Sequence, residues 1–198
     1  MNEHERNDRT FSPARAERLD DPARQQWLPP ARVVEALQLT GHMTVADIGA
    51  GTGYLAIPIA RAVITGRVLA VDFQEEMLDR LRHKLAAGGA PVNVDVVKGE
   101  ARATNVAAAS CDRALIANVW HELDRRGDVL AEMRRILGKK GRLAILDWRA
   151  DVEPPPGPPP AHRIPLDDVI AELEAGRWSV KRSQQVGSFS YIVIADPL

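Results

Sequence analysis

Three glycines at alternate positions follow a short apolar run at 45–48 and precede a helical pattern; they are Gly49, Gly51 and Gly53. Glycine lets the backbone turn tightly and approach a ligand without a Cβ in the way. The free N–H groups at the start of the following helix favour polar or anionic groups. Because ligands of open α/β sheets bind outside the carboxyl ends of the strands, this loop predicts a nucleotide-type ligand there.

Two aspartates accompany the glycine loop. Asp47 lies two residues before Gly49, and Asp72 ends the next apolar run, 19 positions after Gly53. A carboxylate at the end of a strand can accept hydrogen bonds from both hydroxyls of a ribose. The alternative role for Asp72 is to cap the helical pattern that begins at Glu75, and both roles stay open at this point.

The segment 118–122, Asn-Val-Trp-His-Glu, lies at the end of the fourth apolar run. Its histidine and glutamate can carry out acid–base chemistry. The ordinary pKa of histidine lies near neutrality, so His121 is suited to accept a proton, and Glu122 can orient it or hold a cationic substrate. The structural alternative is that His121 packs against a loop and Glu122 supplies an acid to the first turn of the next helix. With Asp147 the two residues also have the ligand types that a metal needs, but nothing fixes their spacing and we expect no metal.

The spacing of the glycines distinguishes two families of nucleotide-binding proteins. A dinucleotide fingerprint has the form G-x-G-x-x-G, whereas here the third glycine comes one residue earlier, which disfavours a nicotinamide oxidoreductase. The arrangement resembles motif I of the class I S-adenosylmethionine-dependent methyltransferases, in particular the small bacterial type 11 and quinone-biosynthesis enzymes. The resemblance extends from about Arg18 to Leu198. It implies S-adenosylmethionine as cofactor and a small-molecule acceptor.

This resemblance implies a role for each residue around the loop. The glycine turn would pass beneath the methionine part of the cofactor, with Asp47 at its ammonium end and Asp72 on its ribose. Phe73 would flank the adenine or else be a core aromatic. The segment 99–101, Gly-Glu-Ala, stands where the family usually has Gly-Asp-Ala, so Glu100 is expected near the adenine amino group. The predicted cofactor-binding residues are Asp47, Gly49, Gly51, Gly53, Asp72, Phe73, Gly99, Glu100, Ala101 and, through its backbone, Asn118.

Methyl transfer is an in-line displacement in which positioning and exclusion of water can do most of the catalysis. A base is required only when the acceptor arrives protonated. We therefore predict His121 and Glu122 as the candidate catalytic residues, and we expect that some acceptors need neither.

Apolar runs and helical patterns alternate from residue 44 onward, with connections of a few residues, which predicts a parallel sheet with helices on both faces. The last two runs are joined through Gly187 and Ser188 and must be antiparallel. The fold expected is α/β, a doubly wound Rossmann-like domain, and the resemblance implies seven strands in a mixed sheet of order 3-2-1-4-5-7-6. The expected strands are 44–48, 67–72, 92–97, 113–119, 142–147, 178–186 and 189–195. The expected helices are 32–39, 54–62, 75–87, 128–137 and 166–174.

Two parts of the chain lie outside this alternation. Residues 1–44 contain four prolines, which forbid a continuous helix, and are expected to form a helical cap over the substrate opening of a cofactor domain at 45–198. The loop 151–163 contains six of the 14 prolines. It is interpreted as a rigid wall of the substrate pocket with His162 and Arg163 as a cationic edge, as an exposed spacer, or as a docking strip for a partner with an aromatic groove.

The composition limits the remaining classes of function. The 198 residues carry 26 Lys and Arg against 27 Asp and Glu, a net charge of −1, which disfavours nucleic acid and anionic membranes as partners. The single Cys excludes an internal disulfide and a thiolate cage for zinc. The first residues are too polar for a signal peptide and no apolar run is long enough to span a membrane, so we expect a cytoplasmic protein.

Two function hypotheses remain. The first is a methyltransferase that acts on a small molecule. The alternative is a non-catalytic module that keeps the cofactor pocket and acts as an interaction subunit. The sequence leaves the oligomeric state open.

Overall fold

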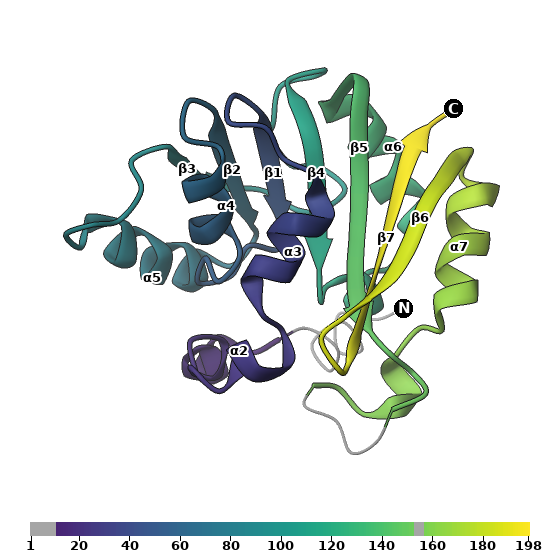
Figure 1. Ribbon diagram of the computed structural model, residues 1–198, viewed down its shortest axis with the longest axis horizontal. Coiled ribbons are helices and arrows are strands. Elements are labelled where there is room, and N and C mark those ends of the chain that lie inside the picture. The colour runs from purple at the N-terminus through teal and green to yellow at the C-terminus, as the bar shows by residue number, and fades with distance from the viewer. Residues whose placement is uncertain (1–10, 153–156) are drawn as a thin grey trace.

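The structure is a computed structural model, and it describes residues 11–152 and 157–198 (Figure 1). These residues form one seven-stranded sheet in the order β3-β2-β1-β4-β5-β7-β6. Strands β1 to β5 pair in parallel, and β7 runs antiparallel to both β5 and β6. The strands are β1 (Thr44–Ile48), β2 (Arg67–Asp72), β3 (Val94–Lys98), β4 (Cys111–Ala117), β5 (Leu137–Trp148), β6 (Trp178–Val186) and β7 (Ser190–Pro197). The predicted fold class, strand order and terminal hairpin are confirmed.

Helices cover both faces of the sheet. On one face α6 and α7 pack Met133, Ile136 and Leu173 against the strands, and on the other α3 and α4 pack Leu37 and Ile59. The central strands are buried on both faces, and such strands are apolar along most of their length. The helices are α3 (Pro30–Leu37), α4 (Ala56–Ala62), α5 (Glu75–Ala86), α6 (Arg126–Ile136) and α7 (Leu166–Ala175).

Short helices and loops gather at the carboxyl ends of the parallel strands. Figure 1 shows α2 (Arg24–Trp27) and the described parts of the loop after β5 at this edge, below the arrowheads of β1 and β4. The hydroxyl of Tyr54 donates to the carbonyl of Leu28 at 2.7 Å and ties the segment after α2 to the glycine loop. The short helices are η1 (Pro13–Leu19), α2 (Arg24–Trp27), η2 (Trp120–Glu122) and η3 (Pro160–His162).

Some predicted boundaries are wrong for identifiable reasons. The third strand begins at Val94 rather than 92, because Val92 is fully exposed. The fourth strand covers 111–117 rather than 113–119, because Asn118 has a φ of 55° and turns the chain out of the strand. The first helix covers 30–37 rather than 32–39, since proline at its first position is compatible with the helix.

The junction between α6 and β5 differs most from the prediction. The sequence predicted a helix at 128–137 stopped by Gly138 and a strand that begins at 142. Instead α6 starts at Arg126 and ends at Ile136, and β5 begins directly at Leu137. Leu137 is buried and pairs with Cys111 of β4, so burial and strand pairing outweigh the turn preference of glycine.

Among the described residues, no helix combines the length and the apolar character that crossing a membrane requires.

Candidate active site

The glycine loop joins β1 to α4 through three left-handed residues. Gly49, Gly51 and Gly53 have φ values of 74°, 54° and 85°, a region that other residues rarely adopt. A Cβ on Gly49 would lie 2.5 Å from Cγ2 of Val119, and one on Gly53 would overlap the side chain of Leu81. The loop therefore needs glycine both for its conformation and for its packing. The helix predicted from 54 begins at Ala56, because the loop continues further than expected.

Asp72 at the end of β2 is tied to the glycine loop. Its Oδ2 accepts a hydrogen bond from the backbone N of Gly51 at 2.8 Å, and its Oδ1 accepts one from the backbone N of Gln74 at 2.9 Å. Burial raises the pKa of this carboxyl, and these backbone donors oppose the rise. Gln74, not Asp72, is the N-cap of α5, so the capping alternative is wrong. Each carboxylate oxygen still has a lone pair for a further donor.

Asp47 is a buried carboxyl at the end of β1. Burial raises its pKa to about 7, the charge of Asp72 adds to the rise, and Arg24 and the backbone N–H of Ala56 oppose it. A buried carboxylate is costly unless a cation or several donors neutralise it. A ligand that places a cation beside Asp47 would lower the cost of ionising this buried carboxyl and would bind more tightly for that reason.

Asn118 follows β4 and holds two unsatisfied polar atoms. Its backbone N donates to the carbonyl of Leu146 at 2.8 Å, which fixes the residue beside β5. The side-chain amide nitrogen and oxygen are buried and have no hydrogen-bond partner in the described part of the chain. Such an amide costs free energy until a ligand supplies an acceptor and a donor.

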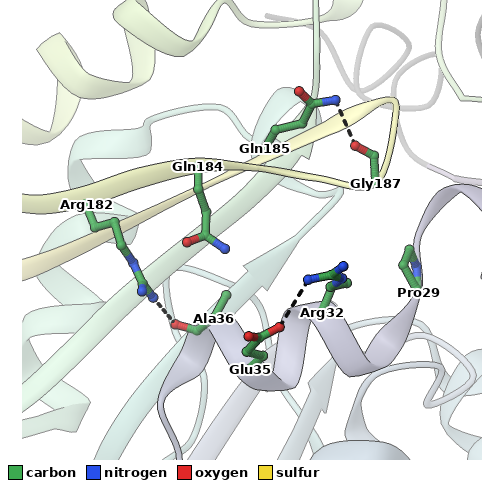
Figure 2. Close-up of a pocket in the computed structure, with 8 residues that line it drawn as sticks. All are labelled: Pro29, Arg32, Glu35, Ala36, Arg182, Gln184, Gln185 and Gly187. Carbon is green, nitrogen blue, oxygen red and sulfur yellow. Dashed lines mark hydrogen bonds and ion pairs between the residues drawn. The ribbon is translucent and has the colours of Figure 1, made fainter.

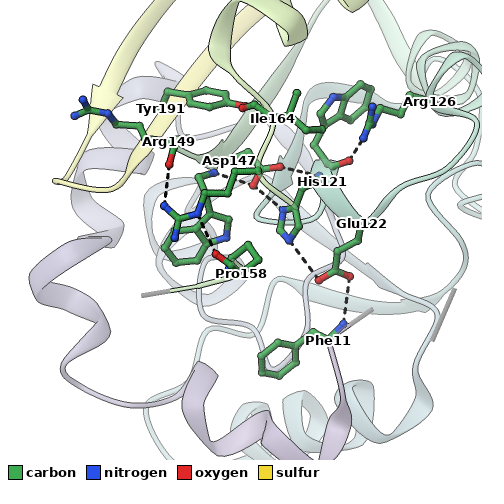
Figure 3. A network of polar contacts seen from close by, with 12 residues as sticks. Phe11, His121, Glu122, Arg126, Asp147, Arg149, Pro158, Ile164 and Tyr191 are labelled. Atoms are coloured by element: carbon green, nitrogen blue, oxygen red, sulfur yellow. Dashed lines mark hydrogen bonds and ion pairs between the residues drawn. The ribbon is translucent and has the colours of Figure 1, made fainter. Parts of the chain in front are cut away.

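A buried network connects His121 to Asp147 (Figure 3). Nδ1 of His121 lies 2.8 Å from Oδ1 of Asp147, whose Oδ2 accepts a hydrogen bond from the backbone N of His121 at 2.8 Å. Nε2 of the ring lies 3.8 Å from Oε1 of Glu122, and Oε2 of Glu122 accepts a hydrogen bond from the backbone N of Phe11 at 3.3 Å. With Asp147 as acceptor, Nδ1 carries a proton and Nε2 is the atom that can exchange one.

The pKa values of two groups in this network, His121 and Glu122, are both raised. Burial alone would lower the pKa of His121, but the hydrogen bond and charge of Asp147 raise it above its ordinary value. Burial raises the pKa of Glu122 to about 7, against the charge of His121 and the backbone donor of Phe11. The pair therefore holds a proton near neutral pH, in a place that water reaches poorly. Among the described side chains, no group of three or more His, Cys, Asp or Glu is arranged to hold a metal ion.

Sequence comparisons place this site in a known family. A family model described as "Methyltransferase domain" matches residues 45–141. The chain is 31% identical over 121 residues to the ubiquinone/menaquinone biosynthesis C-methyltransferase UbiE of Syntrophotalea carbinolica, covering 61% of this chain and 50% of that protein. The chain thus spans about half the length of the curated relatives that it matches.

A solved structure of similar length decides the family. The S-adenosylmethionine-dependent methyltransferase from Aquifex aeolicus is 32% identical, with a TM-score of 0.88 over 94% of this chain and 98% of that one. The chain belongs to the S-adenosylmethionine-dependent methyltransferases. A TehB-like methyltransferase from Corynebacterium glutamicum shares the fold at 18% identity, with a TM-score of 0.69 over 94% of this chain and all of that one. The predicted family, enzyme class and cofactor are confirmed at this level.

The residues of this methyltransferase fit S-adenosylmethionine. The cofactor carries an ammonium group, a ribose with two hydroxyls and an adenine with donors and acceptors. Asp47 offers a buried carboxyl to the first and Asp72 has free lone pairs for the second. The side-chain amide of Asn118 has no hydrogen-bond partner among the residues that the structure describes and can bind a polar group of the cofactor. The resemblance implied a cofactor contact only for the backbone of Asn118. The buried side-chain amide, unpartnered among the described residues, is stronger evidence for a ligand at this position.

The adenine side of the methyltransferase site is less defined. Phe73 is 52% exposed, so the alternative that it is a core aromatic is wrong. Gly99 follows β3 and donates its backbone N to the carbonyl of Asp72 at 3.0 Å, which places the segment 99–101 beside Asp72. Oε2 of Glu100 accepts a hydrogen bond from Nε of Arg102 at 2.9 Å. The predicted contacts of Phe73, Glu100 and Ala101 with adenine stay predictions.

Sequence reasoning missed the aromatic contacts around Trp148. The rings of Trp27 and Trp148 lie 5.2 Å apart, and a Cβ on Gly157 would lie 2.7 Å from the ring of Trp148. Arg163 is buried and donates to the carbonyls of Pro158 and Arg149, so its assignment to a cationic edge is wrong. In residues 157–163 the loop after β5 packs on the end of the sheet. Residues 154–156 of the proline run lie outside the described residues.

A polar groove between α3 and β6 is separate from this site (Figure 2). Its volume is about 460 Å³ and none of the predicted site residues lines it. Arg182 donates to the carbonyl of Ala36, and the side-chain amide of Gln185 donates to the carbonyl of Gly187. Both side chains are engaged with backbone carbonyls, and we assign no ligand to the groove.

The raised pKa of Asp47 predicts that cofactor affinity depends on pH. A bound ammonium favours the ionised carboxyl, so below about pH 7 binding must release a proton, and affinity for S-adenosylhomocysteine should rise with pH by up to about tenfold per unit. Above about pH 7 the affinity should level off. Calorimetric titrations from about pH 5.5 to about pH 8 measure this profile.

The variant Asp47→Asn supplies the control for this profile. It should bind S-adenosylhomocysteine more weakly, and the part of the pH dependence that comes from Asp47 should disappear. An unchanged dependence of affinity on pH would contradict the assignment of Asp47 to the ammonium group. The variant has a second expected effect. Because the folded state holds the proton of Asp47 more tightly than the unfolded state, stability falls as the pH rises from the ordinary value of 3.8 to about 7, and Asn removes this loss.

Proposed function

We propose that this chain transfers a methyl group from S-adenosylmethionine to a small-molecule acceptor that binds beside His121. The observation that carries the proposal is the contact between the glycine loop and the strand end that holds this histidine. Gly49 approaches Val119 so closely that a Cβ would not fit, and Val119 lies two residues before His121. The methionine end of the cofactor and the proton-exchanging atom of His121 would therefore share one edge of the sheet.

We propose His121 as the general base for acceptors that arrive protonated. When bound, S-adenosylmethionine supplies an electrophilic methyl group. Asp147 holds the ring of His121 so that Nε2 is the atom that accepts the proton of the acceptor. Glu122 then stabilises the protonated ring through its charge or holds a cationic part of the acceptor.

The proposed acceptor is a planar ring with an ionisable group. The aromatic side chains of Trp27 and Trp148 contact each other at the same edge of the sheet, and Phe11 lies beside Glu122 in Figure 3. The matching relative is named for C-methylation in ubiquinone and menaquinone biosynthesis, which supports a quinone-type ring. A planar ring buried against aromatic side chains is also favoured by stacking.

We propose that the predicted cap and the loop 151–163 select this acceptor. Within the cap, Leu19 approaches Gly51, and the side chain of Gln74 donates to the carbonyl of Phe11 at 3.0 Å. Residues 11–28 thereby contact both the cofactor side and the His121 side of the edge. A cytoplasmic location and the absence of nucleic-acid partners stay predictions.

Titration with S-adenosylmethionine and S-adenosylhomocysteine, followed by an acceptor screen, tests the proposal. Transfer is followed as S-adenosylhomocysteine released with quinone-type, phenolic and amine acceptors. Turnover with a ring acceptor is the expected result. Binding of the cofactor without transfer to any acceptor class would favour the non-catalytic module, and failure to bind either compound would overturn the function altogether.

A further inference from the structure

Arg24 is a buried cation that forms no ion pair with the carboxylates of the described residues. The residue belongs to α2 and is only 8% exposed. One guanidinium nitrogen, Nη1, donates to the carbonyl of Leu19 at 3.0 Å, and Nε is buried with no hydrogen-bond partner in residues 11–152 and 157–198. A guanidinium has five N–H donors, and leaving them unpaired in a buried place is costly.

The surroundings of Arg24 belong to the cofactor site. Its guanidinium carbon lies 4.0 Å from the ring centroid of Tyr54, the residue that follows the last glycine of the loop. Burial lowers the pKa of Arg24, and the nearby charges of Asp20 and Asp47 only partly oppose this. Asp47 in turn is buried, and the charge of Arg24 acts on it. The two charged groups therefore lie close enough to act on each other, next to the glycine loop.

Another cation near the loop is already engaged. Lys84 donates from Nζ to the carbonyl of Thr52 at 2.8 Å and forms an ion pair with Asp20. Asp20 also accepts a hydrogen bond from the hydroxyl of Thr52 at 2.6 Å. Lys84 and Asp20 therefore satisfy each other at the outer side of the loop, and Arg24 is left for a ligand.

The methionine end of S-adenosylmethionine carries two opposite charges. If Asp47 receives its ammonium group, its carboxylate requires a cation within a few ångströms. A guanidinium binds a carboxylate through two parallel hydrogen bonds, which a lysine cannot do. We propose that Arg24 binds the carboxylate of the cofactor, opposite Asp47, and so fixes the N-terminal segment 19–28 over the occupied glycine loop. This inference rests on the proposed function, because it concerns the same cofactor.

Ligand pairs that differ in the carboxylate test this proposal directly. S-adenosylhomocysteine has the carboxylate, and S-adenosyl-3-thiopropylamine keeps the amine but lacks it. Calorimetry on the intact protein should show roughly 10-fold to 100-fold weaker binding of the second compound to the wild type. In Arg24→Met the affinity for S-adenosylhomocysteine should fall to about that of the analogue, whose own affinity should barely change.

Two further variants control for folding and for charge. Arg24→Lys keeps the charge and the aliphatic stem but loses the planar fork, so it should bind S-adenosylhomocysteine with an intermediate affinity. Arg18→Met removes an exposed cation from η1, directly before this segment, and should change neither affinity. Thermal melts report whether each variant folds, and Arg24→Lys provides the test if Arg24→Met does not.

The possible outcomes distinguish a failure of this proposal from a failure of the proposed function. If the wild type binds both ligands equally, or if Arg24→Met and Arg24→Lys weaken both ligands by the same factor, Arg24 only stacks on Tyr54 and the proposal is wrong, although the chain still binds the cofactor. If the wild type binds neither ligand, the proposed function and this inference both fail. A loss confined to the ligand with the carboxylate establishes the contact.

Discussion

Exchange of His121 for Gln is expected to lower the rate constant of methyl transfer by about 100-fold to 10 000-fold, with the affinity for S-adenosylhomocysteine unchanged. Glutamine is similar in length but cannot take a proton near neutral pH. The buried contact with Asp147 leaves Nε2 of His121 as the atom that exchanges a proton, and the variant removes it. Single-turnover kinetics with an acceptor from the screen measure the effect separately from binding.

The pH profile distinguishes a base from a structural histidine. Because His121 must be deprotonated to act and its pKa is raised, the wild-type rate should increase with pH through a value above the ordinary 6.5. Asp147→Asn removes the charge that raises this pKa, so the midpoint should move to lower pH. His42→Gln, an exchange of an exposed histidine, should alter neither the rate nor the profile. A full rate in His121→Gln would refute the assignment.

Exchange of Asp72 for Ala is expected to weaken binding of S-adenosylhomocysteine by about 100-fold or more, since the two hydrogen bonds that the ribose hydroxyls would donate to the charged carboxylate would be lost. The backbone N–H groups of Gly51 and Gln74 would also lose their acceptor. The free energy of unfolding should therefore fall by about 1–3 kcal/mol. Calorimetry and denaturant titration measure the two effects independently.

A ligand without the 2′-hydroxyl separates the ribose contact from support of the loop. The wild type should bind 2′-deoxy-S-adenosylhomocysteine more weakly than the natural compound, and Asp72→Ala should bind the two alike. Asp79→Ala is the matched control, because Asp79 is exposed on α5 and pairs only with Arg82 among the described residues. Equal binding of both ligands to the wild type would leave Asp72 with the loop-supporting role alone.

The regular part of the fold could be predicted because its signals are local. The first two strands were predicted at their observed bounds, 44–48 and 67–72, since each apolar run is bordered by residues that end a strand. The start of β5 was not predictable in this way. Leu137 continues into a strand only because Cys111 of β4 is there to pair with it, and that partner is 26 residues away in the sequence.

The site also contains residues that a local sequence pattern predicts and residues that only the fold brings together. The glycine loop and Asp72 form one local pattern, and their proximity is confirmed by the hydrogen bond from Gly51. The contact of His121 with Asp147 requires two strands to end side by side. The sequence grouped the two residues only as candidate metal ligands, a role that it disfavoured, and did not predict their hydrogen bond. Arg24 lies in a segment broken by prolines and without a period. Its burial, and the lack of a partner for its Nε within the described part of the chain, could be found only in the structure.

Trp148 contacts both segments that lie outside the cofactor fold. Trp27 of α2 packs on its ring, and Gly157 of the proline loop approaches the same ring too closely for a side chain. A change of length or sequence in one segment thus alters the surface on which the other rests. Specificity for a new acceptor should not be transferable by grafting either segment alone. A chimera that exchanges both segments together with this tryptophan should keep its packing, and divergence within the family should change the two in concert.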